Sequence, residues 1–382
     1  MHLRHLWLKD YRSYDAVDVP LSPGVCAVLG PNGMGKSNLL EAVAYLALLE
    51  SFRGAPADAL IRAGAEQAVV RGEVVDDGRE QLVEAELTRS GRNRVLLNKQ
   101  RLQRGRDLLG ALRVTVFSPD DLALVKGGPA LRRAYLDQLL VQLDPRHDAV
   151  RAEYDRALRQ RNALLKQTRG RLDEAASVTL EVWDTKLVQA GERLAQLRDD
   201  LVVRLDPVVR TAYTDVAGDR AATALRYDSP WRAAGLAAAL AAARDDELRR
   251  GLTLVGPHRD ELVVELNAMP ARTHASQGEQ RSLSLALRLA AHRSVHEVAG
   301  SPPVLLLDDV FSELDPARST ALLRSLPTGQ TLLSTAAGLP AEVHADQVLS
   351  VRLGHVTDDT ATGGTAARAA PASDPGPSGA PQ

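Results

Sequence analysis

Residues Gly30 to Ser37 read Gly-Pro-Asn-Gly-Met-Gly-Lys-Ser, the pattern of a glycine-rich loop that binds nucleotide phosphates. Glycines let consecutive backbone N–H groups curve around phosphate oxygens, and the helix that follows adds the positive end of its dipole. The ammonium of Lys36 can reach the β- and γ-phosphates, and the hydroxyl of Ser37 can hold Mg²⁺. We therefore expect the whole segment to bind ATP with Mg²⁺: Gly30, Pro31, Asn32, Gly33, Met34, Gly35, Lys36 and Ser37.

A second element of such a nucleotide site, which is acidic, lies far along the chain. Residues 304–307 are a continuous apolar run, typical of a central parallel strand buried on both faces, and Asp308 and Asp309 follow at once. We assign Asp308 to the Mg²⁺ side, because an acid at a strand end can bind the water shell of the ion. Asp309 would point to the other side and orient or deprotonate the attacking water, which makes Lys36, Asp308 and Asp309 the predicted catalytic residues. Two adjacent acids that merely form a turn are the alternative.

Residues 276–280 read Ser-Gln-Gly-Glu-Gln and precede an apolar-periodic helix. They resemble the signature motif of ABC-type ATPases, whose serine hydroxyl and helix N-terminus grip the γ-phosphate of ATP held by the partner subunit. This resemblance implies that Ser276, Gln277 and Gly278 complete the nucleotide site of a second copy. Taken alone, a serine before a helix is an ordinary N-cap. Residues 312–315, Ser-Glu-Leu-Asp, resemble the D-loop that crosses such a dimer interface.

Hydrophobic spacing predicts the elements that position these residues. Residues 25–29 read as a strand that runs into the glycine-rich loop, and apolar residues at helical spacing follow it. Alternating apolar runs and turns between residues 69 and 117 predict further strands of the same domain. Residues 331–334 are the expected neighbour of the acidic strand, and two more strands are expected at 252–255 and 262–266.

Between residues 131 and 205 the apolar period is helical, and one seam has a three-four spacing: Leu187, Ala190, Leu194, Leu197 and Leu201. An inserted antiparallel helical arm fits this pattern, and so does a plain buried helix face. A further helix is expected from Ser229-Pro230 to about Gly251. The predicted fold class is α/β, with a P-loop ABC-ATPase head (a mixed sheet with helices) at 1–130 and 251–355, and a helical arm domain inserted at 131–250. Residues 356–382 contain almost no large apolar side chains and are predicted to form a disordered tail.

Composition sets the class of protein. The chain has 382 residues, 45% of them hydrophobic, and a formal net charge of −2, so any contact with DNA must come from a local basic surface. One cysteine, Cys26, cannot form an internal disulfide, which favours a reducing compartment. The longest weakly polar run is about half the ~20 residues that a bilayer crossing requires. We expect a cytoplasmic protein without a membrane partner.

One basic run could bind DNA. No acidic residue occurs between Leu87 and Arg106, and the run contains several candidate phosphate contacts: Arg92, Arg94, Arg101 and Arg104. Cations that protect the edge of a hairpin from strand pairing are an equally good interpretation of this run.

Several stretches resemble the RecF family of the SMC-like branch of ABC ATPases. They are residues 117–137, which begin Phe-Ser-Pro-Asp-Asp-Leu, residues 254–260 (Leu-Val-Gly-Pro-His-Arg-Asp) and residues 275–281. Residues 51–54, Ser-Phe-Arg-Gly, resemble the SMC segment whose arginine lies near nucleotide and DNA, so the resemblance implies that role for Arg53. In places the sequence departs from ABC proteins in general: the Q-loop glutamine is absent, Ser334-Thr335 stands at the usual switch histidine, and Asp309 replaces a glutamate.

Membership of this family implies ATP-dependent homodimerisation, slow DNA-stimulated ATP hydrolysis that resets the dimer, and binding to duplex DNA at gaps. It also implies cooperation with RecR and RecO in loading recombinase, in repair, replication-fork maintenance and the SOS response. An ATPase subunit of a membrane transporter and a short SMC- or Rad50-like head are the alternatives. The missing glutamine and histidine disfavour the first, and the spacer between Ser37 and Ser276 is too short for the long coiled coils of the second.

Overall fold

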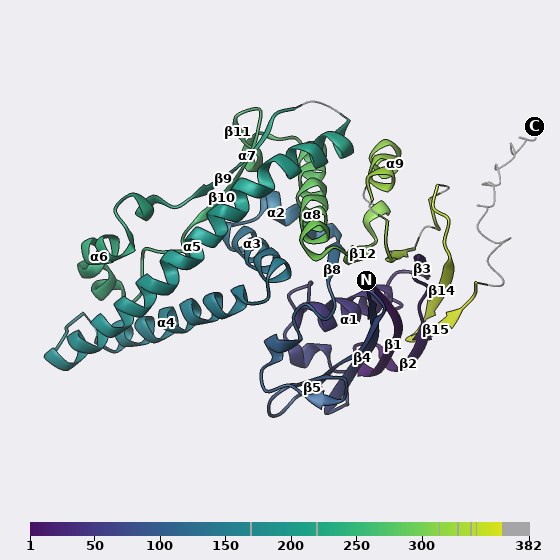
Figure 1. Cartoon of the computed structure of the whole chain (residues 1–382), viewed down its shortest axis with the longest axis horizontal. Coiled ribbons are helices and arrows are strands. Elements are labelled where there is room, and N and C mark those ends of the chain that lie inside the picture. The colour runs from purple at the N-terminus through teal and green to yellow at the C-terminus, as the bar shows by residue number, and fades with distance from the viewer. Residues whose placement is uncertain are drawn as a thin grey trace, which may run out of the picture.

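The computed structural model describes residues 1–168, 170–218, 221–312, 314–326, 328–336, 338–340 and 342–360. Two sheets and helix α1 form a head, and helices α4 and α5 run side by side in an arm that projects from it (Figure 1). No helix in the described ranges is long and apolar enough to cross a membrane.

The first sheet of the head is antiparallel and has the strand order β2-β1-β4-β5-β6-β7. Its β4–β5 hairpin turns at Asp77 and Gly78, which both have positive φ (48° and 73°), as a tight hairpin requires. Buried and accessible residues alternate along β4, so one face of the sheet covers the core. The strands are β1 (His2–Tyr11), β2 (Tyr14–Pro20), β4 (Gln67–Asp76), β5 (Arg79–Thr88), β6 (Arg94–Leu97) and β7 (Gln100–Arg101).

The second sheet has the order β15-β14-β3-β13-β12-β8, and all its strands except β15 run parallel. Along β12, Leu305 and Leu307 enter the core shared with the arm, while Val304 and Leu306 enter the core of the head. The prediction of a strand buried on both faces is therefore confirmed, as is its pairing with β13. The strands are β3 (Val25–Leu29), β8 (Val114–Phe117), β12 (Val304–Asp308), β13 (Thr331–Thr335), β14 (Gln347–Arg352) and β15 (His355–Asp358).

Helix α1 (Lys36–Leu48) contacts strands of both sheets and holds the head together. Gln330, directly before β13, adds a polar link between the sheets: its amide group accepts from the Leu3 N–H at 2.7 Å and donates to the Leu3 carbonyl at 2.7 Å. Short helices complete the head and its border with the arm, namely η1 (Ala57–Leu60), η2 (Gly105–Leu108), η3 (Pro119–Asp121), α2 (Leu122–Lys126), η5 (Val310–Ser312) and α9 (Pro316–Ser325).

The arm has a helical framework and a small sheet of its own. All five residues of the predicted seam are buried on α5, which packs against α4 and α8. The order β11-β10-β9 forms a three-stranded sheet, and β9 packs on α5. The elements are α3 (Pro129–Leu143), α4 (His147–Thr168), α5 (Glu174–Ala217), β9 (Thr223–Asp228), η4 (Pro230–Ala233), α6 (Leu236–Arg250), β10 (Glu261–Leu266), β11 (Met269–Pro270), α7 (Ala271–His274) and α8 (Gln277–Ala299).

Three sequence expectations need correction. The boundary after residue 250 separates β9 from β10, although these two strands pair with each other. Residues 252–255 are not a strand, because side chains of the arm helices satisfy their backbone: the Thr253 N–H donates to Asn162 and the Leu254 N–H donates to Glu247, both at 2.7 Å. Residues 356–358, assigned to the disordered tail, belong to β15, and residues 361–382 lie outside the described part of the chain.

Candidate nucleotide site

The glycine-rich loop connects β3 to α1, as the sequence predicted. Its shape depends on glycine at Gly33 and Gly35, which have φ of 80° and 113°, a region that other residues rarely adopt. A Cβ atom on Gly35 would also stand 2.7 Å from the hydroxyl oxygen of Ser13. The Tyr14 hydroxyl donates to the Gly35 carbonyl at 2.8 Å, so the β1–β2 turn supports the loop from behind.

The N-terminus of α1 is open to an anion. No side chain in the described part of the chain caps it, and its first turn contains no acidic residue, so its N–H groups are available to phosphate oxygens. Lys36 is buried, and its Nζ donates to the Pro31 carbonyl at 3.1 Å and lies 3.5 Å from Oδ1 of Asn32. The ammonium is thus held inside the loop, where phosphate oxygens could replace these neutral acceptors.

Ser37 and Asp308 meet at the start of α1, although 271 positions separate them in the sequence. The Ser37 hydroxyl donates to Oδ1 of Asp308 at 2.8 Å, and the buried Ser334 hydroxyl of β13 donates to the same oxygen at 2.7 Å. The side-chain oxygens of Ser37 and Asp308 are hard ligand atoms, the kind that Mg²⁺ prefers. These residues therefore fit the metal role assigned to Ser37 and Asp308. In the sequence, Ser334 is notable only because it stands where ABC proteins usually have the switch histidine. Its contact with Asp308 could not be predicted, because it depends on the pairing of β12 with β13.

Asp309 leaves the strand in an unusual conformation. Its φ is 49°, and its N–H donates to the Ser334 hydroxyl at 3.0 Å. Non-glycine residues with such φ are uncommon and are mostly Asn, Asp or His. The turn at the end of β12 therefore gives two adjacent carboxylates different backbone conformations. Asp308 is buried, whereas Asp309 is partly exposed.

The signature segment forms a reciprocal cap at the start of α8. The Ser276 hydroxyl accepts from the Glu279 N–H at 3.3 Å, and the Glu279 carboxylate accepts from the Ser276 N–H at 2.7 Å. Hydrogen bonds from Ser276 hold the pKa of Glu279 below its usual value, so a carboxylate occupies this turn. A phosphate that binds here must compete with Glu279. In the D-loop segment, Asp315 caps α9 by accepting from the Arg318 N–H at 2.9 Å, and Glu313 lies outside the described residues.

The segment that carries Arg53 is attached to α1 beside a buried ion pair between Arg12 and Glu41, which the sequence did not reveal. Glu41 is fully buried and accepts from Nε and Nη2 of Arg12, both at 2.8 Å, and from the Ser51 hydroxyl at 2.5 Å. The Ser51 oxygen in turn accepts from the Arg53 N–H at 3.1 Å, and Nη1 of Arg53 donates to Asn38 on α1 at 3.3 Å. The side chain of Arg53 therefore lies beside the first turns of the helix that carries Lys36.

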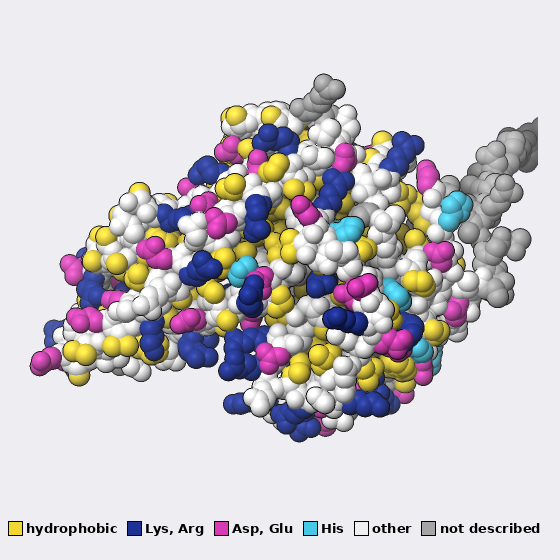
Figure 2. All heavy atoms as spheres, viewed as in Figure 1, with side chains coloured by type: hydrophobic (Ala, Val, Ile, Leu, Met, Phe, Trp, Pro, Cys, Tyr) yellow, Lys and Arg dark blue, Asp and Glu magenta, His cyan; other side chains and the backbone are white. Residues whose placement is uncertain are grey.

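The basic run lies at a sheet edge. It spans β6 and β7, the last strands of the antiparallel sheet, and its four candidate arginines are exposed: Arg92, Arg94, Arg101 and Arg104. Several Lys and Arg side chains lie along the lower edge of the head, where Figure 1 places β5, and on the facing edge of the arm (Figure 2). This position fits both interpretations of the run, phosphate binding and edge protection.

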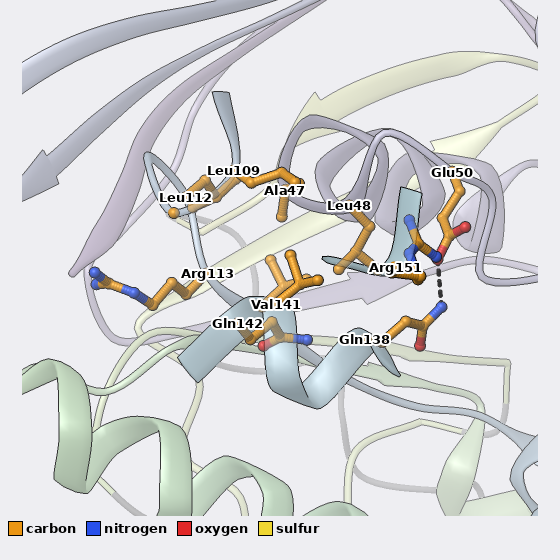
Figure 3. A pocket seen from close by; sticks show the side chains of 12 residues that line it. Ala47, Leu48, Glu50, Leu109, Leu112, Arg113, Gln138, Val141, Gln142 and Arg151 are labelled. Carbon is orange, nitrogen blue, oxygen red and sulfur yellow. Dashed lines mark hydrogen bonds between the residues drawn. The ribbon is translucent and has the colours of Figure 1, made fainter. Parts of the chain in front are cut away.

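The pocket in Figure 3 does not belong to the nucleotide site. It lies where the end of α1 meets α3 and α4, and Gln138 donates to Glu50 across it. Its volume of about 50 Å³ leaves room for one or two waters. Small-molecule sites are typically about 300–1,000 Å³. We therefore assign this pocket to packing between head and arm.

The comparisons with known proteins agree on one group. The family model of the RecF/RecN/SMC N-terminal domain matches residues 2–334. The DNA replication and repair protein RecF of Streptomyces avermitilis is 46% identical over 352 residues, covering 88% of this chain and 94% of the relative. RecF of Acidothermus cellulolyticus is 46% identical over 349 residues, with the same coverage. A solved structure of the recombination mediator protein RecF with ATP, in the RecFOR pathway, superimposes with a TM-score of 0.87 at 28% identity, covering 94% of this chain and 97% of that one.

Proposed function

The chain belongs to the RecF family of DNA replication and repair proteins, and from this premise we propose that it is an ATP-switched DNA-binding protein of recombinational repair and replication-fork maintenance. The observation that carries the proposal is the contact between Ser37 and Asp308 beside the uncapped N-terminus of α1. This arrangement offers backbone N–H donors and one ammonium to the phosphates of a nucleoside triphosphate, and two oxygen ligands to its Mg²⁺.

Each residue of the site has a distinct part in ATP turnover. Lys36 and the loop N–H groups bind and orient the phosphates, and Ser37 and Asp308 hold the magnesium ion, which supplies positive charge to the phosphate oxygens when bound. Asp309 orients the attacking water and accepts its proton. The aspartate is one methylene shorter than the glutamate common in ABC proteins, which supports slow hydrolysis.

ATP acts as the link between two copies of the chain. The signature turn at Ser276 and Gly278 binds the γ-phosphate of ATP held on the partner's loop, and hydrolysis resets the dimer to monomers. Support comes from the α8 N-terminus, where Ser276 and Glu279 of its own capping box are the side-chain acceptors among the described residues. A γ-phosphate that displaces the Glu279 carboxylate gains the same backbone donors.

The DNA partner is duplex DNA at gaps, and the protein partners are RecR and RecO in the cytoplasm. The exposed arginines of the β6–β7 edge, together with Arg53, are the proposed phosphate contacts. The relatives named RecF support this proposal over a transporter subunit. An arm made of helices with 22 and 44 residues supports it over an SMC head with a long coiled coil.

Light scattering tests this function directly. The molar mass of the chain is measured with ATP, with ADP and without nucleotide, each with and without a gapped duplex. We expect a dimer only with ATP, and a complex with DNA that forms far more readily in that state. Equal mass in all three nucleotide states would reject the ATP-driven dimer. An ATP-bound dimer whose mass does not change when the gapped duplex is added would reject the DNA-binding role.

A further inference from the structure

The signature glycine faces a side chain from the helix after the D-loop. A Cβ atom built on Gly278 would stand 2.8 Å from Nη2 of Arg318, so the guanidinium occupies the space that glycine leaves free. Nε of Arg318 donates to the buried Ser282 hydroxyl of α8 at 3.1 Å. Arg318 belongs to α9, so this contact joins the D-loop helix to the signature helix at the surface proposed to meet a partner's ATP.

The guanidinium pairs with one carboxylate, Asp315, and its charge acts on a second, Glu279. Nη1 of Arg318 forms an ion pair with Asp315, and hydrogen bonds from the Arg318 backbone and then from its side chain lower the pKa of Asp315. The charge of Arg318 also contributes to the lowered pKa of Glu279, after the larger effect of hydrogen bonds from Ser276. An incoming γ-phosphate would be repelled by Glu279, and Arg318 supplies the opposite charge next to it.

One amino group of the Arg318 guanidinium donates no hydrogen bond within the described residues. A guanidinium carries five N–H donors in a planar fork that matches phosphate oxygens. Among the described residues, Nε donates to Ser282 and Nη1 to Asp315, and Nη2 has no hydrogen-bond partner. The side chain is 31% exposed, so the free edge of the fork is accessible to a ligand from outside the chain.

We propose that Arg318 binds the γ-phosphate of the ATP held by the partner copy, next to Gly278 and Ser276. This inference rests on the proposed ATP-driven dimer and adds a residue to its shared site. The guanidinium keeps its contact with Ser282 and turns Nη2 toward the phosphate, loosening its pair with Asp315. ADP has no γ-phosphate and cannot make this contact, so Arg318 contributes to the selection of ATP over ADP in dimer formation.

The test compares Arg318→Gln with a matched change on the same helix, Arg324→Gln. Arg324 is exposed and makes no hydrogen bond or ion pair with the described residues. Sedimentation measures the dimer dissociation constant with a non-hydrolysable ATP analogue, and a fluorescent ATP analogue measures nucleotide affinity at concentrations where the chain is monomeric. Loss of a charge-assisted hydrogen bond should weaken the dimer about tenfold or more. Monomer affinity for the nucleotide should not change, and Arg324→Gln should match the unaltered chain.

Two further measurements exclude a purely structural effect. Thermal melting of the nucleotide-free monomer checks that Arg318→Gln folds, and Arg318→Lys, which keeps the charge without the fork, should give an intermediate dimer affinity. If the unaltered chain dimerises with the analogue and Arg318→Gln dimerises as tightly, the role of Arg318 is rejected while the proposed function stands. If the unaltered chain stays monomeric, the proposed function fails and this inference fails with it. An equal loss in Arg324→Gln would also reject it.

Discussion

The substitution Asp309→Asn should separate ATP hydrolysis from ATP binding. Asp309 has a φ of 49°, and aspartate and asparagine are among the residues that tolerate this left-handed conformation best. Asparagine therefore keeps the backbone and the side-chain shape, while it removes the group that accepts a proton from water. Loss of a general base slows a reaction by about 10²–10⁴-fold. We expect a fall of this size in single-turnover hydrolysis with unchanged affinity for ATP.

Lys36→Ala, in contrast, should weaken ATP binding itself, and hydrolysis should fall with it. Among the described residues, the hydrogen-bond partners of the buried ammonium are uncharged oxygens of its own loop, at 3.1 and 3.5 Å, so it can bind phosphates without breaking an ion pair with them. A hydrogen bond to a charged group contributes about 1.5–3 kcal/mol, or roughly ten- to a hundredfold in affinity. Titration with a fluorescent ATP analogue and a phosphate-release assay measure both quantities. Equal loss of affinity in the two variants, or normal hydrolysis by Asp309→Asn, would refute the assigned roles.

Two further predictions concern DNA and stability. Changing the four candidate arginines of the β6–β7 edge to glutamine should lower duplex affinity for every DNA sequence and flatten the dependence of that affinity on salt; they are Arg92, Arg94, Arg101 and Arg104. An unaltered slope of log affinity against log salt would assign DNA binding to another surface. Burial lowers the pKa of His258 to about 4, below its ordinary value of 6.5, so the unfolded chain binds more protons between these values. The free energy of unfolding should therefore fall as pH drops from 6.5 to 4, by roughly 3 kcal/mol from this residue, and urea titrations of His258→Gln should show a weaker pH dependence.

The sequence predicted the parts of the site that depend on local order. A strand, a glycine-rich loop and a helix are consecutive, so the position of Lys36 follows from spacing alone. The approach of Asp308 could also be anticipated, because the carboxyl ends of parallel strands meet at one edge of a sheet, where β13 lies between β3 and β12. The role of Ser334 could not, since it depends on which residue of β13 aligns with Asp308.

Long-range pairing explains most of what the sequence missed. Alternating burial at Thr223, Leu225 and Tyr227 marks β9 as a strand, but it lies between helices and its partner β10 is more than 30 positions away. The apolar residues at 252–255 suggested a strand, yet side chains of α4 and α6 bind their backbone instead. The contact of Arg318 with the signature helix likewise arises from tertiary packing and has no local signal.

The central claim is that each nucleotide site takes Lys36 from one copy of the chain and Ser276 from the other. Mixing a Lys36→Ala chain with a Ser276→Arg chain tests it, because heterodimers then contain one site with both defects and one site with neither. We predict that single-turnover ATP hydrolysis, nearly absent in each variant alone, partly returns in the mixture. If size analysis confirms heterodimers and the mixture hydrolyses no more ATP than the separate variants, the shared site is contradicted.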